Sequence, residues 1–127
     1  MTHLHILDPN PGGNIPVLLL HGMGASGGSW SLQFPPLIEA GYRPLAVDVP
    51  GFGDTPYDGR GWSIQRAAVI IMDAVKELRA GAVHVIGLSM GGVIAQQIAH
   101  DHPLMTRKLV LASTFARLRP DNLTEWY

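Results

Sequence analysis

Short, mostly apolar runs alternate along this chain with longer segments in which apolar residues recur every three or four positions. Runs of this kind are typical of strands buried on both faces of a parallel sheet. They predict strands at residues 17–20, 45–49, 82–86 and 108–112, after a short extended piece at 4–7. Helical spacing, serine caps and terminal glycines predict helices from Ser29 or Ser31 to Ala40, from Ser63 to about Ala80 and from Gly91 to His100.

This alternation predicts one α/β domain, a mostly parallel sheet with helices on both faces and right-handed crossovers between strands. A chain of 127 residues has the usual size of one domain and can bury a core. Charged residues make up only 15% of it, which leaves few charges to cover the outside. Two interpretations stay open: an apolar but ordinary α/β domain, or a domain whose surface is partly covered by another polypeptide.

Composition excludes several classes of function. The net charge is −1 and the nine lysines and arginines are scattered, so there is no basic stripe for nucleic acid. The absence of cysteine excludes disulfides and thiolate zinc sites. The N-terminal segment does not resemble a secretory signal, and no run approaches about eighteen apolar residues, so we expect no membrane span. A cytoplasmic location is the default expectation.

A pentapeptide of the form G-x-S-x-G places Ser89 between the predicted strand at 82–86 and the helix that follows. A serine in such a strand-to-helix turn is held in strained backbone geometry with its hydroxyl exposed, and the flanking glycines avoid collisions with the neighbouring elements. Unpaired N–H groups at the start of the helix also favour an anion formed on the substrate. The pattern therefore predicts that Ser89 is a nucleophile.

The segment at residues 21–24 follows another predicted strand and is the candidate to complete this site. Attack of Ser89 on an acyl carbon places negative charge on the former carbonyl oxygen, which fixed N–H donors must stabilise. We expect those donors to be the backbone N–H groups of Met90 and Met23. Two glycines let the backbone approach the substrate: Gly22 and Gly24. The methionine side chains suit an uncharged acyl group. The alternative to an oxyanion-binding loop is that residues 21–24 form only a turn that ends the strand.

Glycine-rich turns follow three predicted strands, after residues 20, 49 and 86. In an open parallel sheet ligands bind beyond these strand ends, and we call the three loops that begin there the carboxyl rim. The turn at 50–53, taken alone, is most simply a tight strand-to-helix turn. Neither Gly22-x-Gly24 nor Gly51-x-Gly53 has the third glycine of a dinucleotide fingerprint, and no Gly-Lys-Ser/Thr follows either loop. These turns therefore do not favour nucleotide binding.

Three motifs in order along the chain resemble signatures of the α/β-hydrolase superfamily, with the spacing of its small esterase, lactonase and carbon–carbon hydrolase members. They are VLLLHG at 17–22, DVPGFGDT at 48–55 and GLSMGG at 87–92, and the resemblance extends from about residue 4 to 115. It implies that the strands are the second to sixth of an eight-stranded sheet, with Ser89 as nucleophile and Met23 and Met90 as oxyanion donors. It also implies that residues 1–127 are the N-terminal part of a hydrolase core domain lacking the C-terminal strands and helices, with 116–127 leading toward a lid.

The family's catalytic triad runs Ser, then Asp or Glu, then His, with the last two beyond the sixth strand. Only fifteen residues follow the strand at 108–112, and none of them is histidine. We expect His84, five residues before Ser89 on one strand, to lie about 15 Å from it at ~3.3 Å per residue. The other histidines are expected at the far end of the next helix (His100 and His102), far from the carboxyl rim (His3 and His5), or bracing a loop by hydrogen bonds (His21).

No complete triad can therefore be assembled from residues 1–127, and a serine without a base is a poor nucleophile. The predicted function is serine hydrolysis of a small apolar ester, lactone or related acyl compound through an acyl-enzyme, with no metal or organic cofactor. The strand at 108–112 would be an open apolar edge. We therefore expect a complementary C-terminal chain that supplies acid and base, self-association, or a chain that is a fragment of a longer protein. Two alternatives stay open: a catalytically incomplete binding or assembly module, and a cofactor-free haloperoxidase or perhydrolase.

Overall fold

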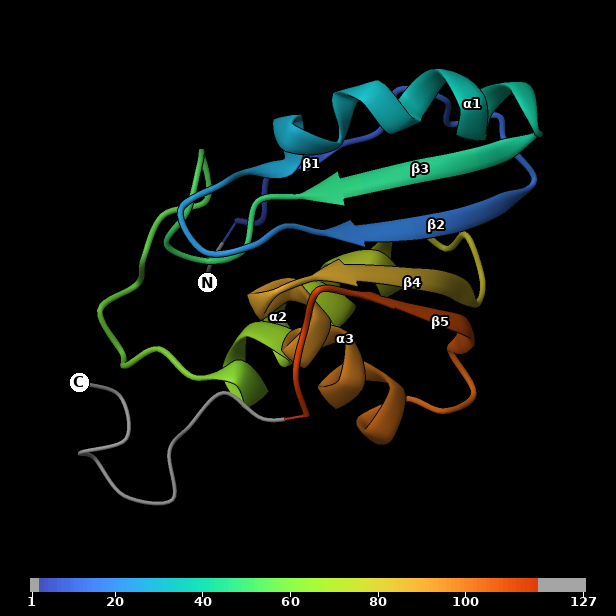
Figure 1. Cartoon of the computed structure of the whole chain (residues 1–127). Helices are drawn as coiled ribbons and strands as arrows, with labels where there is room; N and C mark the ends of the chain where they lie inside the picture. Colours follow the sequence, from blue (N-terminus) through green and yellow to red (C-terminus); the bar gives the residue numbers. More distant parts are fainter. Residues whose placement is uncertain (1–2, 117–127) are drawn as a thin grey trace.

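The computed structural model describes residues 3–116, which form a twisted sheet with helices on both of its faces (Figure 1). The strands are β1 (Ile6–Leu7), β2 (Ile15–Leu20), β3 (Tyr42–Val47), β4 (Val83–Leu88) and β5 (Thr106–Ala112). The helices are the 3₁₀ helix η1 (Gly27–Gln33), α1 (Phe34–Glu39), α2 (Ile64–Glu77) and α3 (Met90–Asp101). The predicted α/β class is confirmed. Within residues 3–116, none of the helices has the length and apolar character needed to span a bilayer. The predicted lead toward a lid at 116–127 lies outside the described residues, apart from its first residue.

The helix boundaries follow from local chemistry. Ser63 caps α2 as predicted, because its side chain accepts a hydrogen bond from the Arg66 N–H at 3.0 Å. The helix ends at Glu77, before the predicted Ala80, because Arg79 takes a left-handed backbone with φ of 53°. The predicted helix up to Ala40 is instead a 3₁₀ helix continued by α1. The reason is that two consecutive prolines, at 35 and 36, lack the N–H groups that a continuous α-helix needs.

The strand order is β1-β3-β2-β4-β5. The central strand β2 pairs in parallel with both β3 and β4, which places Leu20 beside Val47 on one side and Gly87 on the other. Strand β4 pairs in parallel with β5 in turn. The carboxyl ends of β2, β3 and β4 therefore meet at one edge of the sheet, where the strand arrows end in Figure 1. The loops of the carboxyl rim lie together there, as predicted for an open parallel sheet.

Strand β1 is antiparallel to β3, with Ile6 opposite Val47. The residue before β1 consequently lies at the carboxyl end of β3, and the Asp48 N–H donates to the carbonyl oxygen of His5 at 2.9 Å. The prediction that His5 lies far from the carboxyl rim is therefore wrong. A strand of two residues has no periodicity from which its direction can be predicted.

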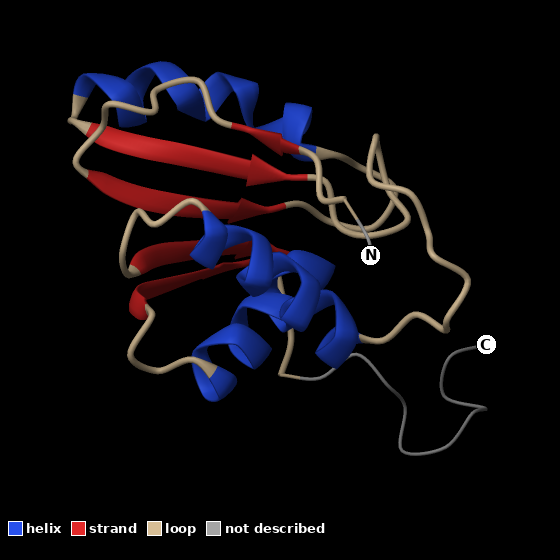
Figure 2. Cartoon of the chain, turned by 180° about the vertical axis from the view of Figure 1, so that it is seen from behind, coloured by secondary structure: helices blue, strands red, loops and turns tan. Residues whose placement is uncertain are grey.

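The two faces of the sheet are covered unequally. Helices α2 and α3 cover one face (Figure 2) and bury the larger core, to which β2, β3 and β4 contribute Leu18, Leu20, Leu45, Val47, Val83 and Val85. On the opposite face, η1 and α1 bury a small cluster of Val17, Leu19 and Ala46. Along β4 the residues that face α2 and α3 are buried, whereas His84 and Ile86 on the opposite face are only partly buried. The cover on this second face is therefore incomplete beyond β2.

Strand β5 is an edge strand of the described sheet, as predicted. Three consecutive apolar residues along it are well exposed: Leu109 by 37%, Val110 by 51% and Leu111 by 43%. Val110 pairs with Ile86 and so belongs to the face that η1 and α1 cover only in part. The described residues thus end in an apolar edge whose backbone hydrogen-bonding groups are free to accept another strand.

Candidate functional site

Ser89 lies at the sharp turn between β4 and α3, with φ of 54° and ψ of −117°. A left-handed backbone costs a non-glycine residue about 1–3 kcal/mol, so the surrounding structure must hold it there. The neighbouring positions have no room for side chains. A Cβ atom on Gly87 would collide with the carbonyl of Gly91, and one on Gly91 would collide with the carbonyl of Leu20. These glycines allow α3 to begin directly against the strands.

Hydrogen bonds hold the backbone of Ser89 on both sides. Its N–H donates to the carbonyl oxygen of Ala112 at 3.0 Å, at the end of β5. Its carbonyl oxygen accepts from the Gly92 N–H at 2.9 Å and from the Thr114 hydroxyl at 2.6 Å. Among the described residues none forms a hydrogen bond with Ser89 Oγ, and the residue is half-buried. The backbone is therefore anchored, while the hydroxyl is available to a substrate at the rim.

The loop after β2 packs directly against Ser89. A Cβ atom on Gly22 would lie 3.4 Å from Ser89 Cβ, so the two backbones approach closely, and Gly24 follows with φ of 80°. Met90 is the first residue of α3, which makes its N–H one of the unpaired donors at a helix N-terminus. Met23 and Met90 line the same cavity, Met23 with its side chain exposed and Met90 buried. The structure brings these residues together, and their catalytic roles stay predictions.

His21 is fully buried below this loop. Its Nε2 accepts a hydrogen bond from the Val49 N–H at 3.0 Å, so the ring proton is on Nδ1, which donates to the Gly22 carbonyl oxygen at 2.7 Å. The ring also meets Phe52 edge to face, with centroids 5.6 Å apart. Both nitrogens are therefore engaged within the rim. This confirms the predicted bracing and leaves no lone pair to take a proton from Ser89.

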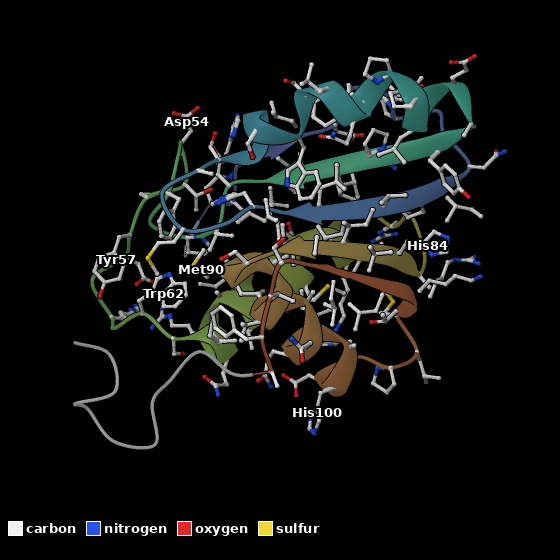
Figure 3. The ribbon with its side chains drawn as sticks, viewed as in Figure 1. Asp54, Tyr57, Trp62, His84, Met90 and His100 are labelled. Carbon is white, nitrogen blue, oxygen red and sulfur yellow. The ribbon has the colours of Figure 1, made fainter. Side chains whose placement is uncertain are left out.

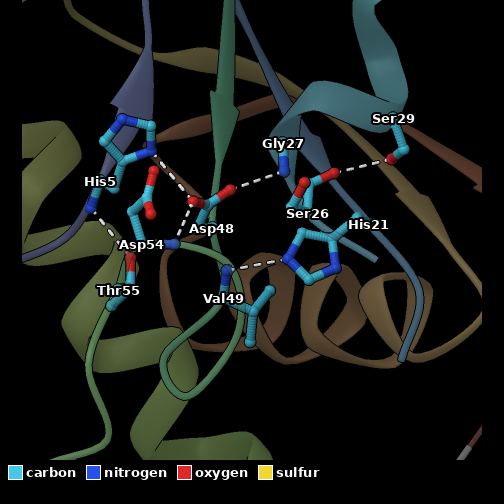
Figure 4. Close-up of polar contacts among 9 residues, drawn as sticks. All are labelled: His5, His21, Ser26, Gly27, Ser29, Asp48, Val49, Asp54 and Thr55. Atoms are coloured by element: carbon cyan, nitrogen blue, oxygen red, sulfur yellow. Dashed lines mark hydrogen bonds and ion pairs between the residues drawn. The ribbon is translucent and has the colours of Figure 1, made fainter. Parts of the chain in front are cut away.

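Asp48 connects the loop after β2 with the loop after β3 (Figure 4). Its buried carboxylate accepts from the Gly27 N–H at 2.6 Å and from the Asp54 N–H at 2.8 Å, and His5 Nδ1 lies 3.0 Å from it. Burial raises the pKa of the Asp48 carboxyl, but the hydrogen bonds from Asp54, Gly27 and His5 together lower it by more than burial raises it. The pKa of Asp48 therefore lies below its ordinary value. Asp48 is therefore an ionised anchor of the rim, a role that the motif alone did not indicate.

In the described part of the chain, one group of side chains has metal-ligand types close together. The donor atoms of His5, Asp48 and Asp54 lie within 4.8 Å of one another. Both oxygens of Asp48 already accept the hydrogen bonds described above, and a cation would have to displace them. The geometry therefore favours a structural role for this group.

Two further histidines lie where the sequence predicts them, away from Ser89 (Figure 3). His84, near the start of β4, is at the opposite end of the sheet from Met90. Its Nδ1 accepts from the Lys108 N–H at 3.2 Å, and burial, followed by two neighbouring positive charges, lowers its pKa. His100 is exposed in the last turn of α3. Neither ring belongs to the carboxyl rim.

Three aromatic residues that the sequence analysis did not place in the site line the cavity beside Met23 and Met90: Phe52, Tyr57 and Trp62. They come from the loop between β3 and α2, and Figure 3 shows Tyr57 and Trp62 at the same end of the molecule as Met90. The available signal was their concentration, because this loop holds three of the nine aromatic residues in the chain. A larger groove of about 880 Å³ lies between the N-terminal segment and α2 and contains none of these residues.

Comparison with known proteins agrees with this geometry. The Alpha/beta hydrolase family profile matches residues 17–126. A poly(3-hydroxyalkanoate) depolymerase from Ectopseudomonas oleovorans is 39% identical over 104 residues, covering 80% of this chain and 35% of the depolymerase. An esterase from Exiguobacterium antarcticum (32% identity, TM-score 0.83) matches 91% of this chain and 42% of its own. A candidate non-heme bromoperoxidase from Mycobacterium tuberculosis H37Rv (30% identity, TM-score 0.82) matches 92% and 43%. This chain therefore spans less than half the length of these relatives.

Proposed function

Because this chain belongs to the Alpha/beta hydrolase family, we propose that it carries the nucleophile of a serine hydrolase acting on a small apolar ester, lactone or related acyl compound. The observation that carries the proposal is the left-handed backbone of Ser89 at the β4–α3 turn, with Gly22 packed against it. The cavity lined by Met23 and Met90 supports an uncharged acyl substrate, since their thioether side chains are soft and apolar.

In the proposed reaction Ser89 Oγ attacks the acyl carbon while a base removes the hydroxyl proton. The charge that develops on the carbonyl oxygen is stabilised by the N–H groups of Met90 and Met23, which are backbone donors and need no reorganisation. Collapse of the tetrahedral intermediate breaks the bond to the leaving group, which takes up the proton, and leaves an acyl ester on Ser89. Water then attacks this ester, releases the acid and restores the serine hydroxyl.

We place the base and its acid partner in polypeptide outside residues 1–127. At the carboxyl rim, His21 is engaged at both ring nitrogens and His5 is held against Asp48 through Nδ1. His84 and His100 lie away from the rim. The exposed apolar edge of β5 is a suitable surface for such a polypeptide to add a strand. The short span of this chain relative to its relatives supports a complementary C-terminal hydrolase segment as that partner.

Chemical rescue tests the role of Ser89 without that segment. The purified chain is treated with a fluorophosphonate, with and without imidazole as an external base, and the labelled residues are identified by mass spectrometry. We expect little labelling without imidazole and selective labelling of Ser89 with it, because the proposal assigns the oxyanion donors to this chain and the base to another segment. Ser89→Ala should remove this label.

Ser113 provides a matched control, because it is another serine with positive φ, 46°, just beyond β5. Ser113→Ala should leave the imidazole-dependent labelling unchanged. Rapid labelling of Ser89 without imidazole would mean that residues 1–127 contain a base, and the divided site would be wrong. Labelling spread over many serines, or none with imidazole, would overturn the assignment of Ser89 and leave an assembly module as the better description.

A cofactor-free perhydrolase or haloperoxidase is the second candidate, favoured by the similarity to the candidate bromoperoxidase. In perhydrolysis hydrogen peroxide replaces water, attacks the acyl ester on Ser89 and releases a peroxy acid. Hydrolysis and perhydrolysis share the acyl ester on Ser89 and differ in whether water or peroxide attacks it. Competition between peroxide and water therefore distinguishes the two reactions. Peracetic acid formed from an acetate ester in the imidazole-rescued chain would favour perhydrolysis, whereas acetate alone would favour hydrolysis.

A further inference from the structure

Within residues 3–116, the cavity at the carboxyl rim is lined by apolar and aromatic side chains and by no charged residue. Its side-chain walls are Met23, Phe52, Tyr57, Trp62 and Met90, and its volume is about 270 Å³. An apolar cavity of about 150 Å³ in another protein is large enough to take up benzene. The volume here therefore admits one aromatic ring with a substituent, or a short branched alkyl chain.

Hydrogen bonds to the loop backbone fix the two largest rings and occupy their polar atoms. Trp62 Nε1 donates to the carbonyl oxygen of Pro50 at 2.8 Å, and the Tyr57 hydroxyl accepts from the Gly61 N–H at 2.9 Å. Phe52 is held by its edge-to-face contact with the buried ring of His21. Because Trp62 Nε1 is engaged and the Tyr57 oxygen is bonded to the loop, the rings present mainly carbon to the cavity, which suits an apolar ligand group.

The mouth of the cavity exposes apolar surface, and two of its residues adjoin the segments that meet at Ser89. Met23 is 68% exposed and Tyr57 is 52% exposed, so a bound group would remove their apolar area from water. Met90 is the residue directly after Ser89, and Met23 directly follows Gly22, the residue packed against Ser89. The cavity thus adjoins both segments that meet at Ser89, so one substrate could place its acyl carbon at Ser89 and an apolar group in the cavity.

We propose that this cavity binds a flat, uncharged apolar group of the substrate, and that the rings of Trp62 and Tyr57 determine which group it accepts. The preferred substrate would then carry an aryl or compact branched alkyl group next to its acyl bond. The role of the cavity in substrate choice rests on the proposed function. Binding of an apolar group in the cavity does not rest on it, because such binding does not require the Ser89 hydroxyl.

Binding of 4-fluorobenzyl alcohol, followed by ¹⁹F NMR, tests the cavity on the whole 127-residue chain. The wild-type chain should give saturable binding. Trp62→Ala should weaken it about tenfold because it removes one aromatic wall, and Trp62→Phe should recover part of this loss. Met23→Gln places an amide at the mouth and should also weaken binding several-fold. Since Trp62 also packs against the core, Met23→Gln at its exposed position tests the cavity without altering that core.

Two controls separate this proposal from the catalytic one. Leu32→Gln changes an apolar residue of η1 that is 83% exposed and outside the cavity, and it should leave probe affinity unchanged. Ser89→Ala should also bind the probe with the wild-type affinity, although it abolishes labelling by the fluorophosphonate. Absence of saturable binding to the wild-type chain, or equal affinity in wild type, Met23→Gln and Trp62→Ala, would overturn the assignment of the cavity whatever the labelling experiment gives.

Discussion

The carboxyl rim and the β5 edge differ in how completely their groups are satisfied. At the rim, His21 and Asp48 are buried with every ring nitrogen and carboxylate oxygen engaged, and glycines allow backbones to touch. Along β5, by contrast, Leu109, Val110 and Leu111 stay between 37% and 51% exposed on a strand with one free side. The buried polar groups of the rim therefore find their partners within this chain, whereas the β5 edge leaves apolar side chains exposed.

This difference separates two requirements of a serine hydrolase. The proposed nucleophile and oxyanion donors depend on contacts between neighbouring strand–helix units, which residues 3–116 contain. The proposed base depends on polypeptide added beyond β5. The two regions are nevertheless coupled, because the Ser89 N–H donates to Ala112 and the Ser89 carbonyl accepts from Thr114, both at the end of β5. A strand added to this edge would be separated only by β5 from β4, the strand that leads into Ser89.

The largest effect should come from breaking the rim at His21. His21→Ala leaves the buried Val49 N–H without an acceptor and opens a cavity beside Phe52, so we expect the free energy of unfolding to fall by about 3 kcal/mol. Urea unfolding followed by circular dichroism measures this. His100→Ala, at an exposed side chain, should change it by less than about 0.5 kcal/mol. Similar losses in the two variants would contradict the bracing role.

Close backbone packing at the rim predicts the next largest effect. Gly91→Ala places a methyl group against the carbonyls of Leu20 and His21, so α3 must shift and the free energy of unfolding should fall by about 2 kcal/mol. Gly12→Ala is the matched control, because an added Cβ there meets nothing within 4 Å. If both variants unfold at the same urea concentration, the prediction that the close contact between α3 and β2 contributes to stability is wrong.

The sequence predicted the features of the fold that local patterns encode. Buried parallel strands appear as apolar runs, and the Ser63 cap and the Gly-x-Ser-x-Gly turn are contiguous in the chain, so the four longer strands, the start of α2 and the turn at Ser89 were all predictable. The open edge at β5 followed from the resemblance to the hydrolase superfamily, whose sheet continues beyond this strand. The exact helix ends were less predictable: α2 ends at Glu77, not at about Ala80, because Arg79 already takes a left-handed backbone.

Features that depend on distant segments could not be predicted in this way. Strand β1 has two residues, and only its pairing with β3 brings His5 to Asp48. The loop between β3 and α2 has no periodicity, so nothing local indicates that Tyr57 and Trp62 turn toward the methionines of other elements. The contact of Thr114 with the Ser89 carbonyl is likewise made across the sheet. Part of the candidate site is therefore encoded in long-range contacts.

A smaller, pH-dependent effect should distinguish Asp48 from an ordinary surface carboxylate. Its pKa is lowered in the folded chain, so ionised Asp48 adds stability above the unfolded-state pKa of about 3.9, and this contribution is lost as the pH falls through the lower folded-state value. Asp48→Asn should therefore be less stable than wild type at neutral pH, and the difference should shrink in acid. Urea unfolding of both proteins, repeated from neutral pH down to pH values below the Asp48 pKa, measures the difference in their free energies of unfolding. Asp73→Asn, at an exposed carboxylate of α2 outside the rim, is the matched control.

The smallest effect on stability, and the sharpest test of the contrast, is expected at β5. Val110→Lys replaces an apolar residue that is 51% exposed, so the free energy of unfolding should change by less than about 0.5 kcal/mol. A lysine on an edge strand opposes pairing with another strand, so this variant should show less self-association than wild type as concentration rises in sedimentation velocity runs.

Leu32→Lys, at a more exposed apolar residue on η1, should associate as wild type does, because that position belongs to no sheet edge. Equal association of all three proteins, or a wild-type chain that stays monomeric at every concentration, would contradict the view of β5 as a docking edge. Loss of association without loss of stability would instead show that the apolar surface of β5 serves contact with another strand. Stability would then come from the core and the rim, and the edge would contribute to function only when a second segment covers it.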